Sequence, residues 1–139
     1  MKIKFVIFYL AGIVSLPVVM QAQLAVNVSS PKVIAQKAVV ELKMTNSFPQ
    51  KIESARAVCF LLDDQGKMVG QSTKWVIGGK DLEGLSPNAD TTYDFVITGQ
   101  HPFSTTNLTA KVLFTKAVLS DNKQIDVAKE ITITPAPHR

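Results

Sequence analysis

The chain has 139 residues, 46% of them hydrophobic, and it carries 15 Lys and Arg against 11 Asp and Glu. This length is typical of one folded domain of about 100–200 residues. The charges are scattered singly along the chain, which argues against nucleic-acid or membrane-surface binding, because those functions need a clustered basic patch.

Residues 1–22 have the features of a signal peptide. Two lysines form a basic start, the residues from Phe5 to Met20 are apolar and uncharged, and Ala22 offers a small residue for cleavage. Met20 stands where a smaller residue is preferred, so an uncleaved anchor is the alternative, although the run is short for a span of about 20 residues. We expect an exported protein, periplasmic or secreted, with no stable membrane span after signal cleavage.

Cleavage changes the charge of the protein. Two of the 15 basic residues and none of the 11 acids lie in residues 1–22, so residues 23–139 carry 13 against 11, a net charge of +2. Cys59 is the sole cysteine, which excludes an internal disulfide. It lies in an apolar run, so we expect a buried thiol acting as a small hydrophobic group.

The first half of the domain reads as strands, because apolar side chains recur at every second residue. Leu24–Val28 and Lys37–Thr45 show this alternation, and loops containing Pro31 and Pro49 follow them. The segment from Ser30 to Ala38 is compatible with one helical turn.

Ile52–Leu62 and Met68–Ile77 are predicted to form a β-hairpin. The turn at Asp63–Lys67 contains Gly66, which supplies the left-handed residue that such turns need. The run Ala57–Leu62 is uncharged and free of Pro, and on an exposed edge it would promote aggregation. We therefore place this strand at the centre of a sheet.

The second half contributes three more predicted strands. The fifth runs through Tyr93, Phe95 and Ile97, the sixth covers Ala110–Leu119, and the seventh covers Ile125–Thr134. The pattern predicts an all-β fold over residues 23–134, an immunoglobulin-like antiparallel sandwich of about seven strands. Residues 135–139 are expected to be a disordered tail.

Four short segments carry a recognisable motif pattern. They are Cys59–Asp63 (CFLLD), Gly66–Gly70 (GKMVG), Leu85–Ala89 (LSPNA) and Tyr93–Phe95 (YDF). Together they resemble exported bacterial β-sandwich domains of the FxLYD type, over about residues 37–100. That family carries an aromatic-x-Leu-Tyr-Asp strand end, a Gly-Lys-Val-Val-Gly turn and a Leu-x-Pro-Gly segment before a Phe-rich strand.

The match to these motifs is partial. Leu61 and Asp63 agree, whereas Cys59 replaces the aromatic residue, Leu62 replaces the Tyr and Asn88 replaces the Gly. The resemblance implies an immunoglobulin-like fold and an extracytoplasmic setting, and it carries no catalytic residues to this chain.

Residues for catalysis or metal binding are sparse in the sequence. The two histidines are His101, in a loop, and His138, in the tail. A hydrolase needs a nucleophile, a base and an orienting group that converge, and a zinc site needs three or four ligands. We expect a protein that is not an enzyme and holds no cofactor or metal.

The aspartates at the predicted turns have two interpretations. Asp63, Asp64, Asp121 and Asp126 could supply oxygen ligands to calcium. Aspartate also favours turns by bonding to its own backbone, and we favour this role for Asp63 and Asp121, each of which opens a turn.

Candidate contact residues lie on one strand and in two loops. The pattern favours a core position for Trp75, whereas an exposed Trp75 beside Lys74 would offer a stacking surface for a sugar or an aromatic partner. The loops at residues 80–90 and 100–106 add Lys80, His101 and Phe103, since long loops often carry function.

These observations lead to two functional hypotheses. The first is a non-enzymatic exported module for protein interaction or a structural role, with an unidentified protein partner and no nucleic acid. It would act through its loops or by strand addition at an exposed sheet edge. The alternative is a carrier of a small ligand, a sugar or a lipid, bound between the sheets or on the Trp75 surface.

Overall fold

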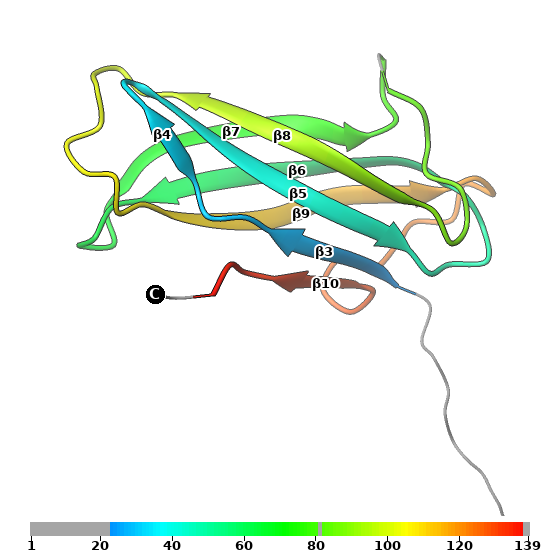
Figure 1. Cartoon of the computed structure of the whole chain (residues 1–139). Helices are drawn as coiled ribbons and strands as arrows, with labels where there is room; N and C mark the ends of the chain where they lie inside the picture. The colour runs from blue at the N-terminus through cyan, green and yellow to red at the C-terminus, as the bar shows by residue number, and fades with distance from the viewer. Residues whose placement is uncertain (1–22, 81, 138–139) are drawn as a thin grey trace, which may run out of the picture.

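The computed structural model describes residues 23–80 and 82–137 as an all-β fold of two sheets around a common core (Figure 1). The predicted signal peptide and residues 138–139 of the predicted tail lie outside the described residues. Over the described ranges, no helix has the length and apolar character needed to cross a membrane.

The first sheet is built on β5 (Lys37–Asn46). β8 (Asp90–Thr98) pairs antiparallel with one edge of β5 along almost its whole length. Two short strands pair with the other edge of β5, β3 (Leu24–Val28) with its second half and β4 (Lys32–Ile34) with its start. The chain leaves the sheet between these two strands. β10 (Ile131–Thr134) runs parallel to β3 on its far side.

The second sheet has three strands in the order β7–β6–β9. β6 (Ile52–Leu62) lies between β7 (Met68–Ile77) and β9 (Thr109–Leu119), antiparallel to both. The predicted hairpin and its central strand are therefore confirmed. Gly66 has a φ of +78° in the connecting turn, as the turn chemistry requires.

The core lies between the two sheets and follows the period-two pattern of the strands. Alternate side chains of the two central strands are fully buried in it: Ala38, Val40, Leu42 and Met44 of β5, and Ala55, Ala57, Cys59 and Leu61 of β6. The expected burial of Cys59 is confirmed. In the loop after β7, Leu85 is buried, whereas Leu82 is exposed.

The structure corrects the prediction at both ends of the chain. The segment expected to allow a helical turn contains the short strand β4, closed by a tight turn in which Ala35 has a φ of +56°. The predicted strand Ile125–Thr134 is wrong over its first part, because Asp126 forms a turn instead. Its Oδ1 accepts hydrogen bonds from the N–H groups of Ala128 and Lys129.

The predicted antiparallel arrangement is also incomplete. β10 pairs parallel with β3, so the C-terminal strand joins the first sheet. Antiparallel pairing with β9 would have extended the second sheet to four strands. Because β10 pairs with β3 instead, no described strand pairs with the second edge of β9, and the candidate site lies on that edge.

Candidate functional site

Trp75 lies on the outer face of the second sheet and is 38% exposed, so the core position favoured by the sequence is wrong. Ala55 is opposite Ile77 and Arg56 is opposite Trp75, which makes Val76 an extra residue in a bulge. Val76 and Ile77 are consequently both buried, and Trp75 turns outward. A single-residue bulge reverses the alternation on which the sequence prediction depended.

The other predicted contact residues fall into two separate groups. Lys74 and Lys80 are exposed near Trp75, at the end of β7. His101 is exposed in the loop between β8 and β9, and Phe103 is half-buried there, its N–H donating to the Ala35 carbonyl at 3.3 Å. Figure 1 shows the end of β7 and this loop at opposite ends of the molecule, so the five residues do not form one site.

The turn aspartates satisfy backbone groups. Asp63 Oδ1 accepts from the N–H groups of Gln65 and Lys67, both at 2.9 Å, and Asp121 Oδ1 accepts from Lys123 N–H at 3.1 Å. The turn role predicted for these two residues is confirmed. Across residues 23–80 and 82–137, no three His, Cys, Asp or Glu side chains gather in a way that could hold a metal ion.

Cys59 lies between the sheets with no exposed surface. Burial raises the pKa of its thiol to about 11, because the surrounding side chains cannot solvate a thiolate. At neutral pH the group is a protonated, inaccessible thiol, which agrees with a packing role rather than a nucleophilic one.

β9 has one edge that no described strand covers. Its ladder partner is β6, along the whole strand, and the bridge between Val118 and Gln124 touches only its C-terminal end. There the following turn folds back, since Ile125 N–H donates to the Ala117 carbonyl and Leu119 N–H to the Lys123 carbonyl, both at 2.9 Å. The edge from Thr109 to Lys116 has no ladder partner among the described residues.

A vacant strand position lies beside this edge. A side chain placed on Gly70 of β7 would meet Ile97 of β8 at 2.9 Å, so these two edge strands face each other. Counting from them, β6 faces β5 and β9 faces β3, while β10 faces no described strand of the second sheet. We call this position, next to β9 and opposite β10, the open strand slot.

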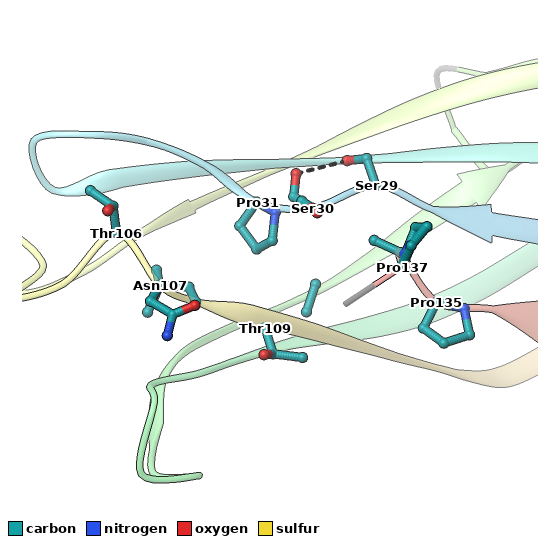
Figure 2. A pocket seen from close by; sticks show the side chains of 11 residues that line it. Ser29, Ser30, Pro31, Thr106, Asn107, Thr109, Pro135 and Pro137 are labelled. Atoms are coloured by element: carbon teal, nitrogen blue, oxygen red, sulfur yellow. Dashed lines mark hydrogen bonds between the residues drawn. The ribbon is translucent and has the colours of Figure 1, made fainter. Parts of the chain in front are cut away.

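The open strand slot ends in a pocket of about 310 Å³ (Figure 2). Three segments line it: the break between β3 and β4 (residues 29–31), the start of β9 (residues 106–110), and the residues after β10 (135–137). Part of the predicted disordered tail is therefore described and forms a wall of the pocket. Pro135 and Pro137 lack a backbone N–H, so they cannot continue β10 as a regular strand.

This edge was not predicted from the sequence, although strand addition was considered as a mechanism. A last strand that began at Ile125, as predicted, would have been able to cover β9. The turn residues Asp126 and Glu130, followed by the Pro-Ala-Pro segment, are the signal that indicates a short last strand.

No family model and no curated protein match the chain. Several solved structures match the chain. A structural-genomics target from Bordetella pertussis, provisionally named ApaA, matches with a TM-score of 0.53 at 15% identity, covering 75% of this chain and 85% of that one. A second target of the same consortium has a TM-score of 0.47 at 12% identity, covering 76% and 77%. The first likeness shows a shared fold.

Proposed function

We propose that this protein is an exported, non-enzymatic, immunoglobulin-like module that binds a partner protein by accepting one extended segment into the open strand slot. The observation that carries the proposal is the unpaired edge of β9 from Thr109 to Lys116. An exposed strand edge is a template for a further strand, and strand addition is a recurring mode of peptide recognition.

The chemistry of the slot defines the segment it would accept. Along an antiparallel strand, residues alternately point their N–H and C=O groups to one neighbour and then to the other. Every second residue of Thr109–Lys116 therefore presents both groups to the slot. The inner side of the slot is apolar, because Ile131 is buried and Ile133 half-buried on the overlying strand. A segment with apolar side chains at alternate positions fits both requirements.

The cellular location and the fold type in this proposal are expectations from the sequence. The signal-like residues 1–22 and the FxLYD-type motifs support export and an immunoglobulin-like outline. The partner is then a protein of the periplasm or the cell exterior. The inaccessible Cys59 and the separation of His101 from the other candidate residues support a role without catalysis.

The edge can be blocked by proline with little change to the fold. Of two adjacent residues such as Ala110 and Lys111, one directs its N–H to β6 and the other to the slot. We expect one of Ala110→Pro and Lys111→Pro to fold normally and the other to be destabilised. The tolerated variant should bind the partner at least about tenfold more weakly, because it loses a backbone bond and adds a ring to the slot.

The partner is found first by crosslinking. Since Cys59 is buried, Thr109→Cys provides the reactive thiol for a photoactivatable label, and Asn27→Cys, exposed on the other sheet, is the matched control. An adduct formed from Thr109→Cys and not from Asn27→Cys identifies the partner, whose contacting segment is then titrated as a synthetic peptide. Equal affinity of the peptide for the unaltered protein and the tolerated proline variant would contradict the proposal.

The exposure of Trp75 favours a second candidate, binding of a small sugar. Trp75 lines an open hollow together with Leu82, Glu83 and Gly84, so one ring face could stack on a sugar while polar groups bind its hydroxyls. Trp75 is the single tryptophan. A fluorescence titration with mono- and oligosaccharides tests this candidate, and an unchanged emission spectrum throughout would rule it out.

A further inference from the structure

The outer face of the second sheet combines apolar and basic side chains from all three strands. The strand register places rows of residues side by side on this face. They are Trp75, Arg56 and Lys116; then Thr73, Val58 and Leu113; then Gln71, Phe60 and Lys111; then Met68, Leu62 and Thr109. We call this surface the β7–β6–β9 face.

Its apolar side chains reach solvent. Met68 is 51% exposed and Leu113 is 47% exposed, while Val58 and Phe60 are half-buried between them. Trp75 ends the face, and the Arg56 guanidinium carbon lies 6.0 Å from its ring centroid, within the range of a cation–π interaction. The apolar centre is thus continuous from the hairpin turn to Trp75.

The charge on this face has one sign. The outward residues of the three strands include Arg56, Lys111 and Lys116 and no Asp or Glu, whereas Lys74 pairs with the buried Ala57 and belongs to the other side of the sheet. Glu53 and Glu83 line the hollow beside Trp75, at one end of the face, and Asp63 lies in the hairpin turn. By contrast, β4, β5 and β8 of the other sheet carry Lys32, Lys37 and Lys43 against Glu41, Asp90 and Asp94. The fold thus brings Arg56, Lys111 and Lys116, which are scattered along the chain, to one face.

We propose that the β7–β6–β9 face docks on an anionic lipid membrane surface. Tryptophan favours the boundary between headgroups and acyl chains, and Lys and Arg can keep their charge among the headgroups while their stems lie on apolar atoms. Each basic residue near such a surface contributes attraction, and Arg56, Lys111 and Lys116 lie together on this face.

A lipid surface fits this face better than a protein does. Lysine is depleted at the centres of protein interfaces, whereas Lys111 and Lys116 flank the apolar centre directly. The basic side chains of this face are flexible, and no fixed set of hydrogen-bonding groups joins them. Such an arrangement suits a fluid layer of anionic headgroups. This site differs from the open strand slot, so the two proposals succeed or fail independently.

The test is co-sedimentation with vesicles of phosphatidylcholine containing about 30% phosphatidylglycerol, compared with phosphatidylcholine alone. We expect binding to the anionic vesicles, release at high salt, and a blue shift of Trp75 emission on binding. The double variant Lys111→Gln/Lys116→Gln should bind about 30-fold more weakly, which follows from about 1 kcal/mol for each lysine.

The matched control is Lys32→Gln/Lys37→Gln, which removes the same charge from the other sheet. It should bind within about twofold of the unaltered protein. Equal weakening by the two double variants would overturn the proposal, because net charge and not the face would then be responsible. Binding to soluble polyglutamate but not to vesicles would also overturn it and would point to an acidic protein.

Discussion

Asn46 is the one buried polar side chain among the described residues, and it joins three segments. Its Nδ2 donates to the carbonyls of Leu85 and Gln50, at 2.9 and 3.0 Å, and its Oδ1 accepts from Phe48 N–H at 2.8 Å. Both of its amide hydrogens and one of the two lone pairs of Oδ1 are used inside the protein. The end of β5 is therefore fastened to the loop before β6 and to the loop before β8.

Replacing Asn46 with Leu should lower the free energy of unfolding by about 3 kcal/mol, because the Phe48 N–H and the Gln50 carbonyl lose their partner, while the Leu85 carbonyl keeps only the bond from Ile52 N–H. Urea unfolding measures the loss. The neighbouring Thr45→Val is the control, since its hydroxyl bonds Asp90 Oδ1 at 2.8 Å on an exposed surface and should cost less than about 1 kcal/mol. A similar loss of unfolding free energy in both variants would show that the Asn46 hydrogen bonds do not hold these loops.

Cys59 gives the stability of the protein a dependence on alkaline pH. Its pKa rises from 9.0 to about 11 in the folded protein, so the unfolded chain loses the thiol proton first as the pH increases. The stabilising effect of the protonated thiol is complete below pH 9 and is lost as the pH rises toward 11. We expect a loss of about 2–3 kcal/mol over this window.

Alkaline pH affects the protein in other ways as well, so the measurement needs a reference protein. Cys59→Ala lacks the thiol and keeps the other groups, and its own unfolding free energy should change less between the two pH values. Subtracting the two profiles isolates the thiol. Parallel profiles would contradict the assignment of the pH effect to Cys59.

At the scale of elements, regular alternation was a reliable guide. The bounds predicted for the strands Leu24–Val28, Ile52–Leu62 and Met68–Ile77 are those of the structure. Asn88 is equally informative. It has a φ of +61°, a left-handed conformation that Asn tolerates better than other non-Gly residues.

Two elements escaped prediction for different physical reasons. The bulge at Val76 is a matter of register between two strands, and the sequence of one strand does not contain it. β4 has three residues, too few for a period to be recognised. Trp75 was consequently assigned to the wrong face, and the β7–β6–β9 face, which depends on cross-strand neighbours, could not be derived from the spacing of lysines along the chain.

At the scale of the whole molecule, the two sheets are unequal, and the inequality predicts where the fold opens. β5 and β6 have neighbours on both edges, so their amides should exchange hydrogen near the rate of global unfolding. β10 has four residues, one neighbour in its sheet and the open strand slot opposite, so it should open locally and exchange far faster. Amides of Thr109–Lys116 should alternate between slow, where they bond to β6, and fast, where they face the slot.

Hydrogen exchange resolved by residue with NMR measures all three sets in one experiment. Ile133→Ala should speed hydrogen exchange in β10 and leave exchange in β6 unchanged. Ile133 is a half-buried residue of β10, so its loss weakens the packing of that strand alone. Uniform protection along Thr109–Lys116 would mean that the slot is filled in the free protein. A partner's segment would then have to displace the occupant, so binding would be weakened by the free energy of displacement, and exchange at β9 measures that quantity directly.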